Sequence, residues 1–249
     1  MVTLGRIGLG AVTLGVVPSE RRAIDRQDWP RLAVLGLLWI AIPETLLPVA
    51  QQWINSAITG MLIGAVPSIT AIIAAVMLRR RPGIAQQLGI TIGLVGIVLI
   101  SLPSVSDGNT ALIGVGAVLV AALLYALSAN LTPLQQKYGS LPVMRRVLAI
   151  GVVFTVPYAL VGADQSARTA PAVGAVIVLG IVATGVAFVA YGALIGHAGA
   201  TRASGVLCVL PVVALVLGIS LRGDEVKPLA YLGCICIVIA TVFVSRQGR

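Results

Sequence analysis

An internal repeat constrains the fold of this chain more than any other feature of its sequence. When the sequence is shifted by 144 residues, residues 34–101 align without a gap on residues 178–245, and 8 of the 68 aligned positions are identical. The coincident positions include glycines and prolines: Val34-Leu35-Gly36 on Val178-Leu179-Gly180, Pro67 on Pro211, and Leu88-Gly89 on Leu232-Gly233. Such a duplication within apolar segments is the usual architecture of membrane carriers.

The composition excludes a water-soluble domain. Apolar residues make up 58% of the chain and charged residues 10%, with a mean hydropathy of +1.05, whereas a soluble domain carries about 25% charged residues. The net charge of +9 does not indicate nucleic-acid binding, because aromatic residues are only 4% of the chain and the basic residues lie between apolar runs. The basic residues are better explained as signals of membrane topology.

Nine apolar runs predict an all-α polytopic membrane protein. Eight of them approach or reach the roughly 17 to 25 residues that span a bilayer: 32–49, 57–78, 84–102, 111–131, 147–162, 171–196, 203–221 and 228–245. The ninth, residues 2–17, contains Arg6 and is short, reaching about 24 Å against a hydrocarbon core of about 30 Å. A signal peptide is the alternative interpretation of this run, but four glycines dilute its apolar core and no small-residue cleavage site follows.

The basic residues predict the orientation of the chain. With nine helices, thirteen Lys and Arg residues fall on one side of the membrane: Arg21, Arg22, Arg26, Arg31, Arg79, Arg80, Arg81, Lys137, Arg145, Arg146, Arg202, Arg246 and Arg249. Four fall on the other: Arg6, Arg168, Arg222 and Lys227. The positive-inside rule places the larger set, and hence the C-terminus, in the cytoplasm. The repeated connectors, 79–82 and 222–227, then lie on opposite faces, so the repeats are inverted, as alternating access requires.

The two repeats are predicted to differ in length. The first, residues 1–103, has four visible helices, and the second, residues 108–246, has five. Residues 111–131 begin the second repeat and have no counterpart in the first. A ten-helix plan therefore lacks its first helix, and we expect a further apolar stretch of about 20 residues before Met1.

Glu44 is the main candidate for solute binding, because it is the only acidic residue inside an apolar run and lies between Pro43 and Pro48. A carboxylate at that depth costs about 3 kcal/mol on insertion scales, so we expect it to face a wet cavity or to be protonated. It would bind an amine-bearing or cationic solute or exchange a proton, with Gln51 and Tyr191 as further polar contacts. A structural role, capping backbone groups freed by the two prolines, is the alternative.

Pro67 and Pro211 are candidate hinge or cavity residues. Each removes a backbone hydrogen bond from a membrane helix and permits a kink; an inherited structural kink is the alternative interpretation. Catalytic motifs are missing, His197 is the only histidine, and the three cysteines lie within apolar runs. The sequence therefore predicts neither an enzyme nor a metal site nor a bound cofactor.

Two segments resemble the signatures of the EamA family of the drug/metabolite transporter (DMT) superfamily: SAITGMLIGAVPSITAI at 56–72 and GATRASGVLCVLPVVALVLGISLRGDE at 199–225. The resemblance extends over nearly the whole chain. It implies ten helices in two inverted five-helix repeats, and a central cavity lined by the third, fourth, eighth and ninth helices of the family plan. The family's Gly-Glu after the fourth helix of each repeat is absent from the first copy, which has Arg79-Arg80-Arg81, and is extended to Gly223-Asp224-Glu225 in the second.

The resemblance implies a multi-pass carrier of the inner membrane that exports a small metabolite, amino acid or drug-like solute by alternating access. Its partners would be the solute and membrane lipid. Transport would be coupled either to protons or to the solute gradient. The alternative is a truncated, non-transporting membrane protein or an assembly partner. A few cavity side chains decide the substrate, so the sequence predicts its class only.

Overall fold

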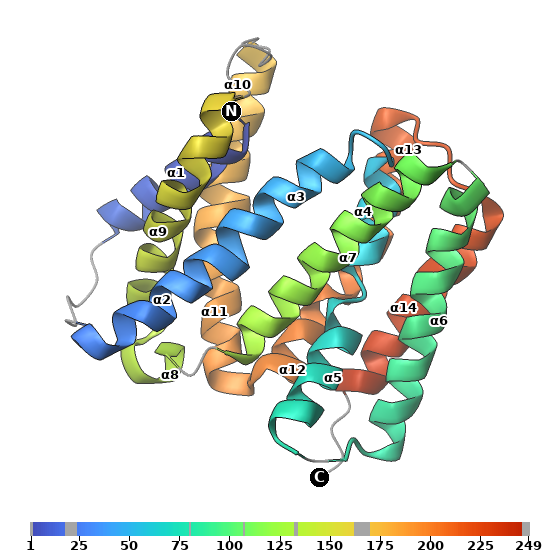
Figure 1. Cartoon of the computed structure of the whole chain (residues 1–249), viewed down its shortest axis with the longest axis horizontal. Coiled ribbons are helices and arrows are strands. Elements are labelled where there is room, and N and C mark those ends of the chain that lie inside the picture. The colour runs from blue at the N-terminus through green and yellow to red at the C-terminus, as the bar shows by residue number, and fades with distance from the viewer. Residues whose placement is uncertain are drawn as a thin grey trace. The chain divides into compact units, whose positions relative to one another are not determined.

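The computed structural model describes residues 2–17, 24–79, 81–106, 108–131, 134–161 and 170–245 (Figure 1). The described residues form helices and connectors and contain no β-strand. In chain order the helical elements are α1 (Val2–Val16), η1 (Arg26–Asp28), α2 (Trp29–Leu35), η2 (Gly36–Ala41), α3 (Ile42–Ala50), α4 (Ser56–Ile63), α5 (Val66–Met77), α6 (Ile84–Ser106), α7 (Asn109–Asn130), α8 (Leu134–Tyr138), α9 (Ser140–Val161), α10 (Ala170–Val178), η4 (Leu179–Val186), α11 (Ala187–Ala198), α12 (Ala200–Ser204), η5 (Gly205–Cys208), α13 (Val209–Arg222) and α14 (Pro228–Ser245).

Eight helical segments of the described chain are long and apolar enough to cross a membrane, from 26–50 through 228–245. The α1 helix is apolar but has only 15 residues. The predicted class, an all-α polytopic membrane protein, is confirmed.

The chain forms two compact units, each built from both halves of the sequence. Unit 1 contains Met1–Thr45 and Leu131–His197, and unit 2 contains Leu46–Asn130 and Ala198–Arg249. These units differ from the two repeats predicted at 1–103 and 108–246, because each unit collects helices from both. The repeat boundaries remain a prediction about the sequence.

In unit 1, α1 packs against α9 and η4, and α9 packs against η2 and α2 (Figure 1). Two of these helix contacts are equivalent under the 144-residue shift. Gly36 of η2 leaves no room for a side chain against Ile150 of α9, and Gly180 of η4 leaves none against the Arg6 carbonyl of α1. Since 36 and 180, and 6 and 150, are each 144 apart, aligned positions make equivalent contacts here.

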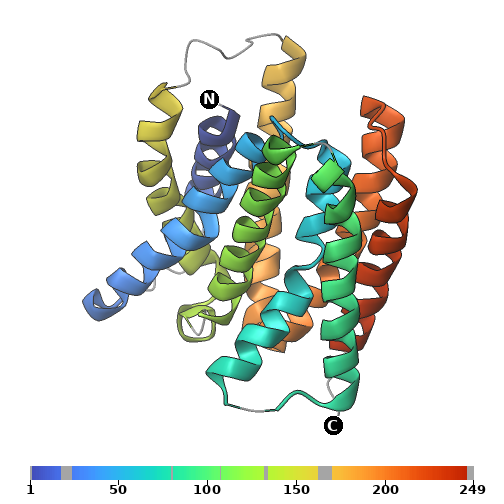
Figure 2. The same cartoon turned by 45° about the vertical axis from the view of Figure 1, so that its right-hand side comes forward.

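Unit 2 is organised around two helix pairs, α6 with α14 and α4 with α13, and α7 packs against α4 and α5. The first pair runs antiparallel (Figure 2). A Cβ at Gly89 would lie 2.8 Å from the Ala240 carbonyl oxygen, and one at Gly233 would lie 2.7 Å from that of Gly96. Such close approach of backbones is how membrane helices pack through small residues, and again the two contacts are related by the 144-residue shift.

Four of the membrane spans are interrupted, at aligned places in the two copies. The π-helical segments η2 and η4 occupy aligned positions. The span that contains Pro67 breaks after α4, and the span that contains Pro211 passes through the 3₁₀ segment η5. The sequence predicts kinks within continuous helices, but each proline instead stands in the first turn of a new α-helix, α5 or α13, where its missing N–H is least costly.

Candidate functional site

The main candidate, Glu44, forms an ion pair in which its own side chain is buried and that of Arg6 is partly buried. It lies in the first turn of α3, is 4% exposed, and pairs with Arg6 of α1 within unit 1. The sequence predicts a wet cavity or a protonated carboxyl; the structure provides a cation from a neighbouring helix instead. Opposite charges held together in an apolar interior neutralise each other, whereas either charge alone would be strongly unfavourable there.

Arg6 was not predicted as the partner of Glu44, although the sequence contains a signal for the pair. Among the apolar runs, Glu44 is the only acidic residue and Arg6 the only basic one. The structural alternative for Glu44 is less favoured by the local geometry. The proline residues free carbonyl oxygens, which an ionised carboxylate cannot bind because it only accepts hydrogen bonds. At this point of the helix the Thr45 hydroxyl lies 2.9 Å and 2.8 Å from the carbonyl oxygens of Ala41 and Ile42.

Tyr191, the second candidate, belongs to an aromatic cluster in the same unit. Trp39 of η2 is 2% exposed, and its ring centroid lies 6.0 Å from that of Phe188 and 6.3 Å from that of Tyr191, both on α11. The rings meet at 59° and 72°, the tilted and edge-on geometries that aromatic pairs prefer. Trp39 and Glu44 lie on the same membrane span, so one span contributes to both the ion pair and the aromatic cluster.

Two buried hydroxyls of unit 1 have no hydrogen-bond partner among the described residues. They are Oη of Tyr191 and Oγ1 of Thr184, about two helical turns apart on one span. Burying a hydroxyl without a hydrogen-bond partner costs about 1 to 3 kcal/mol of folding free energy. A polar ligand that bonds the hydroxyl, as donor or acceptor, recovers part of this cost. Thr184 was not predicted, because threonines in apolar helices usually bond a carbonyl of the preceding turn, as Thr13, Thr70 and Thr155 do here.

The five candidate residues are divided between the two units, with Glu44 and Tyr191 in unit 1. Gln51 lies in unit 2, in an exposed turn after α3. Pro67 and Pro211 are also in unit 2 and are buried. The ring of Pro211 occupies the space beside Gly64, at the break between α4 and α5. Unit 1 therefore supplies the polar and aromatic groups, and unit 2 supplies the two proline breaks.

A second polar cluster, not predicted from the sequence, joins α8 to the start of the Arg26–Ala50 span. Nζ of Lys137 lies 2.7 Å from Oδ2 of Asp25 and 2.9 Å from Oδ2 of Asp28, and Oη of Tyr138 lies 2.8 Å from both carboxylates. Hydrogen bonding by Lys137 lowers the pKa of Asp25, and the same bond raises the pKa of Lys137. Both groups are therefore charged at neutral pH. The cluster stabilises the packing of α8 against the start of the Arg26–Ala50 span, at one end of unit 1.

An α-helical membrane protein with interrupted spans and buried polar groups at membrane depth has the features of a solute transporter. The model of the EamA-like transporter family matches residues 1–102 and 112–246. The chain belongs to this family, which is part of the DMT superfamily.

Similar proteins carry transporter names. An uncharacterized transporter of Archaeoglobus fulgidus is 22% identical, covering 97% of this chain and 87% of its own. A probable terminal-alkyne amino-acid exporter of Streptantibioticus cattleyicolor is 25% identical, covering 99% of this chain and 84% of its own. The uncharacterized inner membrane transporter YedA of Escherichia coli is 28% identical, covering 86% of this chain and 70% of its own.

A solved crystal structure superimposes with a TM-score of 0.70 at 17% identity, covering 98% of this chain and 88% of that chain. This likeness concerns the fold. Family membership shows that the protein is a multi-pass membrane transporter rather than an enzyme, with a small solute and membrane lipid as its partners.

Proposed function

We propose that this transporter exports a small amine-bearing solute of the amino-acid class, and that Glu44 binds the amine. The observation that carries the proposal is the pairing of the buried Glu44 with Arg6, on a span that also contributes Trp39 to the aromatic cluster. A zwitterionic solute would replace this pair charge for charge, its ammonium on Glu44 and its carboxylate on Arg6. The exchange avoids leaving an unpaired buried charge, which costs about 3 to 5 kcal/mol.

The neighbouring groups suit the rest of such a solute. Trp39, Phe188 and Tyr191 offer apolar and π surface, and the hydroxyls of Thr184 and Tyr191 are free to bond polar atoms. The name of the Streptantibioticus relative, a probable amino-acid exporter, agrees with this chemistry. Gln51 is a weaker candidate in the proposal because it lies in an exposed turn of unit 2.

Alternating access is the proposed mechanism, with the helix interruptions at Pro67 and Pro211 as hinge points. Interrupted helices lack some internal hydrogen bonds, so their halves reorient at lower cost than continuous helices do. We further propose a cytoplasmic C-terminus in the inner membrane, and energy coupling to protons through Glu44 or to the solute gradient.

The Glu44→Gln variant tests the proposal in proteoliposomes, with uptake of a panel of labelled amino acids measured from pH 5.5 to 8.5. We expect wild-type transport to depend on pH and the variant to lose at least roughly tenfold in rate, about 1.4 kcal/mol, together with that pH dependence. Glu225→Gln is the matched control, because Glu225 is exposed and only its backbone carbonyl bonds Asn55. This control should transport as the wild type does.

A double variant, Arg6→Gln with Glu44→Gln, separates function from folding. It removes both charges at once, so it should unfold at a temperature close to that of the wild type and still fail to transport. Unchanged transport with an unchanged pH profile in Glu44→Gln would assign Glu44 a structural role and move the search to the helices around Pro67 and Pro211.

A further inference from the structure

A groove on unit 1 lies apart from the buried ion pair and the aromatic cluster. It has a volume of about 550 Å³ and runs between α2 and α9. Its lining is Arg26, Trp29, Pro30, Ala33, Ile150, Val153 and Phe154. Apart from Arg26 and the ring nitrogen of Trp29, these side chains are hydrocarbon, and Val153 and Phe154 are 68% and 47% exposed.

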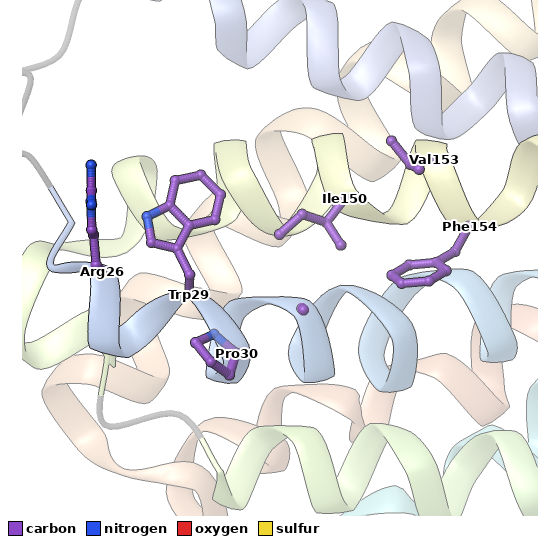
Figure 3. Close-up of a pocket in the computed structure, with 7 residues that line it drawn as sticks. Arg26, Trp29, Pro30, Ile150, Val153 and Phe154 are labelled. Carbon is purple, nitrogen blue, oxygen red and sulfur yellow. The ribbon is translucent and has the colours of Figure 1, made fainter.

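The groove has a polar end and an apolar end. Figure 3 shows Arg26 and Trp29 together at one end, with the indole nitrogen of Trp29 on the side of Arg26, and Ile150 and Phe154 farther along. Arg26 is the first residue of the span 26–50, so the polar end lies where the membrane span begins. Trp and Arg at such a position are typical of the lipid headgroup region.

The charge at the polar end is available to an anion. The neighbouring Arg31 pairs with Asp28, and Lys137 pairs with Asp25 and Asp28. Within the described part of the chain, no carboxylate lies within ion-pair distance of Arg26. An Arg guanidinium beside an indole N–H presents several donors to one anion, as a phosphate requires.

We propose that this groove binds an anionic phospholipid of the surrounding bilayer. The phosphate lies at Arg26 and Trp29, and one acyl chain lies along Ala33, Ile150 and Phe154. The site is independent of the solute proposed above, since none of its residues belongs to the ion pair or the aromatic cluster. Basic pockets beside membrane helices at the cytoplasmic surface are where anionic lipids bind.

The test uses the whole chain, purified in detergent with equal amounts of phosphatidylglycerol and phosphatidylcholine. Native mass spectrometry then counts the lipids that each protein molecule retains. The wild type should retain phosphatidylglycerol preferentially. Arg26→Gln should lower that preference about fivefold, the effect of one basic residue at an anionic surface, and Arg26→Lys should preserve part of it. Phe154→Ala should weaken retention of both lipids.

Arg31→Gln is the matched control, because it removes the same charge one turn away, from a side chain outside the groove. The proposal is overturned if Arg31→Gln lowers the lipid preference as much as Arg26→Gln does, or if Arg26→Gln leaves it unchanged. It is also overturned if a transported amino acid displaces the lipid, since the groove would then be a solute site.

Discussion

The two connectors at aligned positions of the repeats, 79–82 and 222–227, share a left-handed residue just past a helix but differ in charge. The first is basic, whereas the second balances Arg222 and Lys227 against Asp224 and Glu225. The left-handed residues are Arg79, with φ 50°, after α5 and Gly223, with φ 66°, after α13. Glycine accepts this conformation without a steric penalty, whereas an L-residue with a side chain does not. The left-handed position therefore occurs in both copies, while the residue that suits it is present in one copy only.

The residues that follow the left-handed position differ between the two connectors in what they contact. The Asp224 carboxylate lies 2.7 Å from Oγ of Ser56 and accepts a 3.0 Å hydrogen bond from the Ala57 N–H. It therefore adds to the cap at the start of α4, where the side chain of Asn55 accepts from the Ile58 N–H. The aligned helix α12 begins after Gly199, which supplies no side-chain cap. The second connector therefore stabilises a helix end, while the first carries the positive charge that we expect to set the orientation of the chain. Figure 2 shows the end of α5 and the end of α13, after which the connectors follow, at opposite ends of unit 2.

The two connectors should differ completely in their labelling from outside the cell, because we expect them to lie on opposite sides of the membrane. With Cys208, Cys234 and Cys236 replaced, a single cysteine at Arg81 should be reached by an impermeant thiol reagent only after the cells are opened. A single cysteine at Glu225 should be labelled in intact cells, because the positive-inside rule assigns the two connectors to opposite faces. Both positions are exposed, so burial does not decide the result.

Labelling of both cysteines in intact cells would contradict the inversion, since the connectors would then share a face of the membrane. Labelling of Arg81→Cys alone would reverse the orientation but keep the inversion. Permeabilised cells are the control, in which both positions should react.

A smaller effect is expected from the helix cap. Asp224→Ala removes the acceptor for the Ser56 hydroxyl and the Ala57 N–H, so the protein should lose about 1 to 2 kcal/mol of stability, as other N-cap losses do. Thermal unfolding in detergent measures the change. Glu225→Ala is the control at the adjacent exposed position, and it should stay within about 0.5 kcal/mol of the wild type. Equal effects of the two substitutions would contradict a specific cap.

The spans could be predicted from the sequence because a bilayer requires long apolar runs, and charge is nearly absent from them. Their ends could not be predicted as well. The α9 helix begins at Ser140, seven residues before its apolar run, and the span 26–50 begins six residues before its own. Charged residues such as Arg145 and Arg146 end an apolar run, but their long side chains reach the interface and the helix continues.

The candidate site was predictable only in part. A lone carboxylate in an apolar run singles out Glu44, but its partner Arg6 lies 38 residues away, and only packing within unit 1 shows the contact. The same holds for Trp39 and Tyr191, which are recognisable as deep aromatics but not as neighbours. Thr184 carries no signal, because its sequence context does not distinguish a hydroxyl bonded to the backbone from a free one.

The smallest effect tests whether the two left-handed positions are equivalent. Arg79→Gly should stabilise the protein and Gly223→Ala should destabilise it, each by about 1 kcal/mol, because a side chain in this conformation crowds its own backbone. At Gly223 a Cβ would meet no other atom, so the penalty there is conformational rather than a clash. Thermal unfolding of the two single variants and of the Arg79→Gly/Gly223→Ala double variant, all in the same detergent, measures whether the two changes in stability add. Near-cancellation in the combination is expected of two separate sites. A destabilising Arg79→Gly would instead mean that the Arg79 side chain stabilises the end of α5 by more than its backbone strain costs, and the two connectors would then differ in backbone energetics as well as in chemistry.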